Sequence, residues 1–464
     1  MLESGQATAL EITRYYLQRI AALDPGINAV IATDPDRALA EAAASDARRL
    51  AAGVIGPLDG VPILIKDNIE AAGLPGTAGS RALLASPPSQ DAPVVGRIRR
   101  AGMVLLGSTN LSEWANFRST ASTSGWSAVG GQTNNPYDPA RNTSGSSSGS
   151  AAAVAAALAP LTVGTETDGS IVSPAGLCGV VGFKPTHGTV PGAGIVPISS
   201  RQDVAGPITR CVSDAARLYE VLAGVRLEIE PMPLNGLGIS VWLPKDTEPE
   251  TAAVLRKLAD QLAAAGCVLA SGDADPGGPF SDDEFTALLS EFAVELPAYL
   301  AQRPGQHPRS WAELLHFNRT DPVELSKFSD EIFALAQAAP SLESTDYLQA
   351  RSRADIGAQA ALKAVLAGHD YAITLTNRPA WLTSYSGSED GHISTSTPAA
   401  VTGAPALTLQ GGIVDGLPVG ITVIGERGDD AGVLALGLAI EQLLPPRIDP
   451  PIAQRDTAQP ISSA

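Results

Sequence analysis

The stretch Val61-Pro62-Ile63-Leu64-Ile65-Lys66-Asp67 places a lysine directly after a short apolar run. A run of this kind is typical of a strand that is buried on both faces. A second run, Met103 to Leu106, has the same character, and a helical pattern from Val94 to Arg100 lies between the two. Strands that alternate with helices predict an α/β fold around a largely parallel or mixed sheet.

The alternation continues on both sides of this segment. Residues 8–53 predict two helices, and beyond Leu237 we expect a strand at 239–243 and then a helix to Ala265. The remaining expected elements are helical segments to about Leu366, a strand at 370–375, a hairpin at 406–425 turning at Asp415-Gly416, and a helix at 431–443. The Pro-rich tail, 445–464, is expected to be poorly ordered.

The composition is that of an acidic protein with enough apolar residues for a large core. The chain has 464 residues, of which 44% are hydrophobic and 17% charged, and its net charge is −18. This composition excludes global disorder. The negative charge disfavours nucleic acid as a partner, because phosphates attract basic surfaces. We expect small neutral or cationic molecules as ligands.

The cysteines and the first residues bear on the cellular environment. Cys178, Cys211 and Cys267 are too few and too scattered for a disulfide framework. No run approaches the ~20 apolar residues of a membrane span. Residues 1–20 lack the pattern of a secretory signal. They begin almost inside a predicted helix, and a segment preceding them would change the expected location of the protein. We expect a cytoplasmic monomer or homodimer without membrane contact or cofactor.

Two segments rich in small residues are candidates for the functional site. Residues 119–150 are dominated by Ser, Gly, Thr and Asn and run directly into a helical stretch at 151–157. The apolar residues 161–163 are then followed by Gly164-Thr165-Glu166-Thr167-Asp168-Gly169-Ser170. Glycine-rich turns that lead into helices place backbone N–H groups where an anion can bind.

One interpretation takes Ser147 as a nucleophile, because Gly145-Ser146-Ser147-Ser148-Gly149 matches G-x-S-x-G. That motif requires a strand before the serine and a helix after it. Residues 134–144 are turn formers, and no histidine has an evident acidic partner. The sequence therefore disfavours this interpretation.

A second interpretation starts from Lys66. A lysine in apolar surroundings loses solvation of its cation, which lowers its pKa and makes the neutral amine a general base. Ser146 could relay a proton from Ser170 to Lys66, and the N–H groups of residues 167–170 could form an oxyanion hole. A metal or carboxylate site is a third interpretation, but no clustered ligand spacing occurs. The acidic residues from Asp273 to Glu284 are expected to form a solvated loop.

Three motifs in this order resemble the amidase signature family. The first is Gly60-Val61-Pro62-Ile63-Leu64-Ile65-Lys66-Asp67-Asn68-Ile69. The second joins residues 144–153 to residues 164–171, and the third is Gly182-Phe183-Lys184-Pro185-Thr186. The resemblance covers nearly the whole chain, including Leu417-Pro418-Val419-Gly420.

The resemblance implies a fold and a mechanism. The fold is a single α/β/α domain over residues 1–444, with a signature core at about 55–225 and a helical, substrate-shaping part at about 280–366. The mechanism is that of a Ser-cis-Ser-Lys triad. It makes Ser170 the nucleophile that forms an acyl-enzyme, Ser146 the bridging serine and Lys66 the base, with Thr167, Asp168, Gly169 and Ser170 as the oxyanion hole.

Within the family the chain is similar to bacterial peptide amidases, which share Asp168 and Ser148 where many members have glycine. Asp168 is either a turn residue that faces solvent, or a carboxylate near the leaving group or near a substrate ammonium. Five other residues are candidates for lining a substrate channel, although core packing is an equal alternative for each of them. They are Glu113, Trp114, Asn116, Phe117 and Trp126.

These observations lead to one main functional hypothesis and two alternatives. The main hypothesis is hydrolysis of a carboxamide, such as the C-terminal amide of a peptide or an aryl or alkyl amide. The first alternative is the glutaminase subunit of a tRNA-dependent amidotransferase, against which the acidic charge, Asp168 and Trp114 argue. The second alternative, an inactive binding relative, is disfavoured because Lys66, Ser146 and Ser170 are all present.

Overall fold

The computed structural model describes residues 1–51, 53–274, 280–386, 389, 392–393 and 395–455. The strands are β1 (Val30–Thr33), β2 (Pro62–Lys66), β3 (Val104–Thr109), β4 (Trp126–Ser127), β5 (Gly131–Gln132), β6 (Leu161–Glu166), β7 (Val181–Lys184), β8 (Val204–Thr209), β9 (Gly238–Trp242), β10 (Val268–Gly272), β11 (Tyr371–Leu375), β12 (Ala406–Val414) and β13 (Leu417–Gly425).

The α-helices are α1 (Ala9–Leu23), α2 (Pro35–Leu50), α3 (Pro93–Arg100), α4 (Ser148–Ala155), α5 (Val172–Leu177), α6 (Val212–Ala223), α7 (Pro249–Ala264), α8 (Ser281–Gln302), α9 (Trp311–Thr320), α10 (Glu331–Gln337), α11 (Thr345–Leu366), α12 (Thr397–Thr402) and α13 (Asp430–Leu443). Short 3₁₀ turns are η1 (Asp24–Gly26), η2 (Arg81–Leu83), η3 (Glu113–Asn116) and η4 (Pro451–Gln454).

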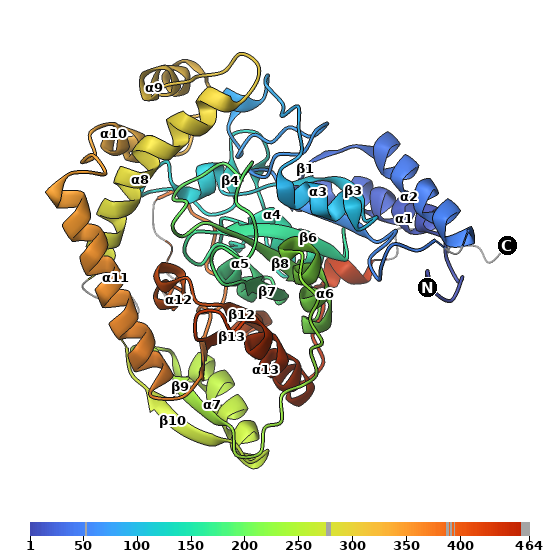
Figure 1. The fold of residues 1–464 in the computed structure, drawn as a ribbon, viewed down its shortest axis with the longest axis vertical. Helices are drawn as coiled ribbons and strands as arrows, with labels where there is room; N and C mark the ends of the chain where they lie inside the picture. The colour runs from blue at the N-terminus through green and yellow to red at the C-terminus, as the bar shows by residue number, and fades with distance from the viewer. Residues whose placement is uncertain (52, 275–279, 387–388, 390–391, 394, 456–464) are drawn as a thin grey trace.

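A single mixed sheet of 11 strands forms the centre of the molecule (Figure 1). Its order is β1-β3-β2-β6-β8-β7-β12-β13-β11-β9-β10. Strands β3, β2 and β6 are parallel to one another, and so are β11, β9 and β10. The strands between these two groups pair antiparallel. This arrangement confirms the predicted α/β fold with a mixed central sheet covered by helices.

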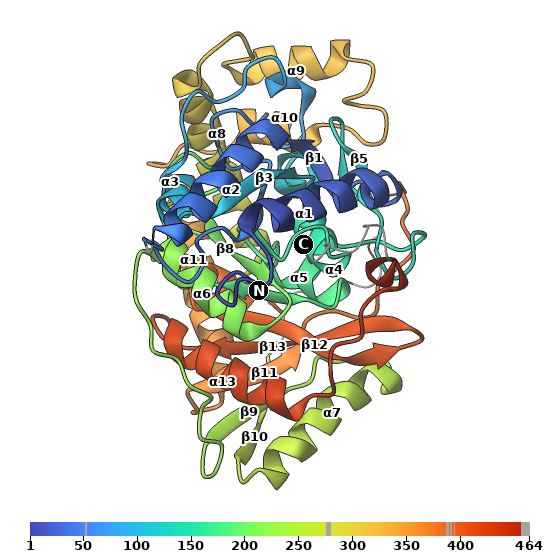
Figure 2. The same ribbon diagram turned by 90° about the vertical axis from the view of Figure 1, so that its right-hand side faces the viewer.

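Helices cover both faces of the sheet because its inner strands are apolar on both sides. In β2, Ile63 and Ile65 join a core with residues of α3, α6, α7 and α13. Leu64 points the other way and packs with α1, α2 and α4. Figure 2 shows α13 lying across β12 and β13, which it contacts. Every residue of β2 is buried, as its continuous apolar run predicts.

The long helices α8 and α11 pack together along one side of the molecule, with α9 and α10 at one end of them (Figure 1). Their core is aromatic: Phe292, Trp311 and Phe333 contact one another edge-on or at a tilt. This part of the chain corresponds to the predicted helical segments.

Comparison with the expected elements shows where the sequence pattern was insufficient. The hairpin turns at Asp415-Gly416, where both residues have positive φ, as a two-residue hairpin requires. Strand β1 was not predicted, and neither was β10, which is an edge strand with a largely exposed or half-buried sequence.

The described part of the C-terminal tail is held in place. The buried Arg19 guanidinium donates to the carbonyl oxygens of Ala453 (3.1 Å) and Arg455 (3.0 Å). The expectation of poor order is therefore wrong for this part, while residues 456–464 lie outside the described residues. No helix in the described ranges is long and apolar enough to cross a membrane.

A buried ion-pair network fixes the loop after β3 to the helical layer. Arg118, with a side chain 0% exposed, donates to the carboxylates of Glu113 (2.9 Å) and Glu324 (3.2 Å). Its guanidinium also lies over the ring of Phe328, 4.4 Å from the centroid. We expect Arg118→Met to lower the free energy of unfolding by about 3–5 kcal/mol, because it leaves buried carboxylates without a partner.

Equilibrium unfolding in urea checks this prediction. Arg353→Met is the matched control, because Arg353 pairs with Asp283 at the surface. That substitution should change the free energy of unfolding by less than about 1 kcal/mol. Equal effects of the two substitutions would show that the buried network does not stabilise the fold.

Candidate active site

The fold brings together three segments that are far apart in the sequence. Lys66 is the last residue of β2, Ser146 lies just before α4, and Ser170 lies in the turn between β6 and α5. Because β6 pairs parallel with β2, the ends of both strands lie at the same edge of the sheet. The first turn of helix α4 packs tightly against the backbone just before β1. A Cβ atom at Gly149 would lie 2.3 Å from the carbonyl oxygen of Ala29, so only glycine fits there.

Lys66 is completely buried, with a side chain surrounded by hydroxyl groups. Its Nζ lies 2.7 Å from Ser146 Oγ and 2.9 Å from Thr165 Oγ1. Burial lowers the pKa of Lys66 to about 7, although the negative charges of Asp203 and Glu166 favour the cation. A lysine with such a pKa is neutral in about half of the molecules near pH 7.

Ser146 lies between Lys66 and the turn that carries Ser170. The Gly145–Ser146 peptide bond is cis. The Ser146 carbonyl oxygen accepts from the N–H of Ser112 (3.0 Å), and the N–H of Ser147 donates to the carbonyl oxygen of Ser170 (3.1 Å). The two serine segments are thus joined through their backbones. Within the described residues, no hydrogen bond joins the hydroxyls of Ser146 and Ser170.

Ser170 is 8% exposed and opens into a cavity of about 230 Å³, called here the Ser170 cavity. The cavity is lined by Ala115, Asn116, Phe117, Ser124, Ser144, Gly145, Thr167, Asp168, Gly169, Ser170, Ser173, Ile198, Leu288, Glu389 and His392. In the part of the chain that the structure describes, no acceptor engages the N–H groups of residues 167–170. Free N–H groups beside a hydroxyl can bind a developing oxyanion.

Two carboxylates hold the turn 167–170 in place. Glu166 accepts from the N–H groups of Ile171 (2.7 Å) and Val172 (3.0 Å), directly after Ser170. Asp203 accepts from the Thr167 hydroxyl (2.6 Å). Burial raises the pKa of Asp203 to about 7. The turn is therefore fixed at both ends by side chains that do not line the Ser170 cavity.

Ser147, the centre of the G-x-S-x-G match, has a different environment. Its hydroxyl donates to the carbonyl oxygen of Thr165 (3.0 Å) and accepts from the Thr165 N–H (3.1 Å). It does not line the Ser170 cavity, and residues 133–147, all described, contain no strand. The geometry therefore agrees with the sequence in disfavouring Ser147 as a nucleophile.

The predicted substrate-contact residues divide into two groups. Asn116 and Phe117 line the Ser170 cavity. Glu113, Trp114 and Trp126 lie outside it: the first is paired with Arg118, and the two tryptophans pack edge-on against phenylalanines of the helical layer. The geometry places these three in the core.

The backbone before Phe117 is unusual. Trp114, Ala115 and Asn116 all have positive φ, at 50°, 56° and 68°. Non-glycine residues in this left-handed region cost free energy and occur most often at functional sites. Here the strained turn presents Asn116 and Phe117 to the cavity.

Asp168 lines the cavity with a half-buried carboxylate, so its side chain does not simply face solvent. The carboxylate accepts from the hydroxyls of Ser396 (2.5 Å) and Thr397 (2.6 Å). Sequence reasoning missed the other residues that shape this side of the cavity, among them Leu288, Glu389 and His392. Burial raises the pKa of Glu389, and its hydrogen bonds with Ser124 and the neighbouring His392 offset part of this rise.

The acidic segment before and within α8 also differs from expectation. Asp282, Asp283 and Glu284 form the first turn of α8, and Glu284 is buried. Its carboxylate accepts from the side-chain amide of Gln202 (2.9 Å). The predicted solvated loop is therefore wrong at Glu284, while Asp275 lies outside the described residues.

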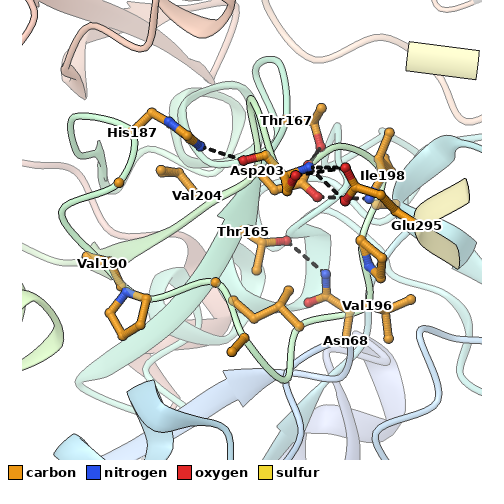
Figure 3. Close-up of a pocket in the computed structure, with 18 residues that line it drawn as sticks. Asn68, Thr165, Thr167, His187, Val190, Val196, Ile198, Asp203, Val204 and Glu295 are labelled. Carbon is orange, nitrogen blue, oxygen red and sulfur yellow. Dashed lines mark hydrogen bonds between the residues drawn. The ribbon is translucent and has the colours of Figure 1, made fainter. Parts of the chain in front are cut away.

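A second cavity of about 450 Å³ is lined by Thr165 and Thr167, and it shares Thr167 with the Ser170 cavity (Figure 3). Asn68 lines it and donates to Thr165 Oγ1 (3.0 Å), the hydroxyl that Lys66 also contacts. Asp203 and Glu295 are at the opposite end, where Thr167 and Ser200 donate to them. The Thr165 hydroxyl therefore links Lys66 to a residue that lines this second cavity.

The arrangement is suited to hydrolysis of an acyl compound through a serine nucleophile. It provides a base of lowered pKa, a hydroxyl in contact with it, and a serine that lines a cavity beside free N–H groups. Within the described residues, no group of three or more His, Cys, Asp or Glu side chains could hold a metal ion.

Comparison with known proteins agrees with this chemistry. A family model described as amidase matches residues 11–434, and the chain belongs to this amidase family of amide hydrolases. A probable amidase of Arabidopsis thaliana is 34% identical over 94% of this chain and 86% of its own length. The crystal structure of native peptide amidase from Stenotrophomonas maltophilia superposes with a TM-score of 0.88, at 40% identity over 96% of each chain.

Another relative is named as a subunit of an amidotransferase and not as an amidase. A glutamyl-tRNA(Gln) amidotransferase subunit of Chloroflexus aurantiacus is 32% identical over 95% of this chain and 94% of its own length.

Proposed function

We propose that the chain hydrolyses the carboxamide of a small amide or of a short peptide amide through an acyl-enzyme on Ser170. Ser170 Oγ attacks the carbonyl carbon while its proton passes to Ser146, whose own proton passes to Lys66. The N–H groups of the turn 167–170 bind the oxyanion. The C–N bond then breaks, and the proton returns through Ser146 to the leaving nitrogen, which departs as ammonia.

Water completes the reaction by the same route in the second half. It attacks the ester carbonyl and gives a proton through Ser146 to Lys66. The ester bond then breaks, the carboxylic acid leaves, and Ser170 recovers its proton. The residues act without a metal or cofactor in this scheme, because Lys66 supplies the base and the backbone supplies the electrostatic stabilisation.

The observation that carries this proposal is the buried contact between Lys66 Nζ and Ser146 Oγ, at 2.7 Å. A fully buried lysine that has no ion-pair partner among the described residues is costly unless it serves as a neutral base. Its pKa of about 7 matches that role, since general bases work best near the operating pH.

Substrate preference is tested by release of ammonia from three classes of amide. We expect kcat/KM for an N-blocked amino-acid amide to be at least about tenfold higher than for a fatty amide or a short aliphatic amide. A cavity of about 230 Å³ excludes long chains, and the polar groups that line it offer acceptors to a peptide-like group. Preferred turnover of the fatty amide would contradict this assignment.

The similarity to a glutamyl-tRNA(Gln) amidotransferase subunit supports a second candidate, a glutaminase that works with partner proteins. Free glutamine distinguishes the two functions. Glutamine hydrolysis faster than hydrolysis of the N-blocked amide, with stimulation by a co-purifying protein, would favour the second candidate. We propose instead that the chain acts alone or as a homodimer, without nucleic acid.

A further inference from the structure

Two acidic side chains line the Ser170 cavity. Asp168 and Glu389 both contribute carboxyl groups, and among the described residues that line the cavity the basic side chain is His392, with no lysine or arginine. Lys66 does not line the cavity. The turn 167–170 lines it as well, and its N–H groups make no hydrogen bond in the described residues. A substrate in this cavity therefore meets donors at the reacting carbonyl and acceptors elsewhere.

The two carboxylates are held by neutral donors rather than by cations. Asp168 accepts from the hydroxyls of Ser396 and Thr397. Glu389 accepts from the N–H of Ser124 (2.7 Å) and from its hydroxyl (3.1 Å). Neither carboxylate takes part in an ion pair among the described residues, in contrast to the nearby Glu113, which is paired with Arg118. Burial raises the pKa of both carboxyls, and the neighbouring His392 offsets part of that rise in each, so a further cation in the cavity would favour their ionised forms.

A third acidic side chain, Glu284, interacts with Asp168. Glu284 is buried, and its hydrogen-bond partner, Gln202, is uncharged. Burial, and after it the charge of Asp168, raise the pKa of Glu284 to about 8, so Glu284 is mostly protonated at pH 7. Arg351 is the cation that offsets this effect, and it is shared with Glu291 and Asp355. A positive charge in the cavity would favour the ionised forms of Asp168 and Glu284.

Asn116 provides an independent indication of a donor group in the ligand. Its side-chain Nδ2 donates to Ser124 Oγ (2.9 Å). Its Oδ1 is shielded from solvent and has no hydrogen-bond partner in the described residues. A buried acceptor without a donor is costly, and a ligand that carries N–H groups would satisfy it. This acceptor lies in the same cavity as the two carboxylates.

We propose that the acyl part of the substrate carries a protonated amine, which binds among Asp168, Glu389 and Asn116 while the carboxamide lies at Ser170. This inference rests on the proposed amide hydrolysis at Ser170 and names the substrate class that the site prefers. The amine is either the α-ammonium of an amino-acid amide or a basic side chain. An anionic acyl group is rejected, since it would face uncompensated carboxylates.

Two substrate pairs distinguish the source of the charge at pH 7. Leucinamide and its 2-hydroxy analogue differ in the α-ammonium, and Nα-acetyl-lysinamide and Nα-acetyl-norleucinamide differ in the side-chain charge. We expect kcat/KM to favour the cationic member of at least one pair by about tenfold or more. In Asp168→Asn this ratio should fall to about twofold or less, whereas the exposed control Asp36→Asn should keep it.

The ratio of the two kcat/KM values within a substrate pair distinguishes recognition of the charge from structural damage to the turn 167–170. Any general disturbance of residues 167–170 lowers turnover of both members and leaves the ratio unchanged. Glu389→Gln serves as a second variant, expected to lower the same ratio, if Asp168→Asn does not fold. Equal kcat/KM within both pairs of the wild type, or a ratio that neither substitution changes, would overturn the inference. Absence of turnover for all four amides would instead refute the proposed function.

Discussion

Ser170→Ala is expected to lower kcat for a neutral amide by about 10⁵-fold or more, because removal of a serine nucleophile alone costs about as much as removal of a complete triad. The expected loss is about 7 kcal/mol of transition-state stabilisation. The substitution removes one hydroxyl that faces the Ser170 cavity and makes no hydrogen bond in the described residues, so the fold should be kept. Steady-state release of ammonia measures kcat, and thermal unfolding checks the fold.

Ser147→Ala is the matched comparison for this substitution. Ser147 lies at the centre of the G-x-S-x-G match, but its hydroxyl is bound to the backbone of Thr165. We expect it to lower stability by about 1–3 kcal/mol, as for a buried hydrogen bond, with less than about a tenfold change in kcat. The reverse pattern, an active Ser170→Ala and an inactive Ser147→Ala, would move the nucleophile to Ser147.

Lys66→Met should lower kcat/KM by about 10³–10⁴-fold, because it removes the general base and leaves Ser146 without an acceptor for its proton. In the wild type, the amine accepts a proton only when it is neutral. The pKa of Lys66 is lowered to about 7, so the protonated form dominates below that pH. We therefore expect kcat/KM for a neutral amide to fall about tenfold per pH unit below pH 7 and to level off above it.

The fall of kcat/KM below pH 7, called here the acidic limb, is assigned to protonation of Lys66. The charge of Asp203 offers a check on this assignment. Asp203 favours the Lys66 cation and so raises the pKa of Lys66. Burial raises the pKa of Asp203 itself to about 7, so its charge is present above that pH and is lost through the same range. Asp203→Asn removes the charge at every pH, and the limb should shift to lower pH while kcat at high pH falls less than in Lys66→Met. A limb that moves to higher pH would show that another group controls the titration.

The strand that ends at Lys66 could be predicted from the sequence, because a strand buried on both faces leaves a continuous apolar run. The chemistry of the lysine also followed from burial. The catalytic role of each serine did not follow from the residues alone. Ser146, Ser147 and Ser148 are adjacent residues of the same type, and only the resemblance to a family distinguished their roles. The structure adds a physical reason, since the Ser146 hydroxyl contacts Lys66 and the Ser147 hydroxyl contacts Thr165.

The wall opposite Ser170 could not be predicted. Glu389 and His392 reach the cavity from a loop beyond β11, and no local pattern links them to the serine motifs. Glu284 was predicted to lie in a solvated loop because its neighbours in the sequence are acidic. In the structure it lies in the first turn of α8 and binds Gln202. Trp114 and Trp126 were candidates for either a substrate channel or the core, and the structure packs both in hydrophobic clusters. Long-range packing decides such positions.

Covalent labelling with a serine-directed fluorophosphonate tests the central claim most directly. Attack by the nucleophile forms an O–P bond and releases fluoride, and mass spectrometry of the digested protein locates the adduct. We expect one adduct, on Ser170, with a labelling rate that rises through pH 7 and is nearly abolished in Lys66→Met. An adduct on Ser146 or Ser147, or labelling of Ser170 that does not depend on Lys66, would contradict the account.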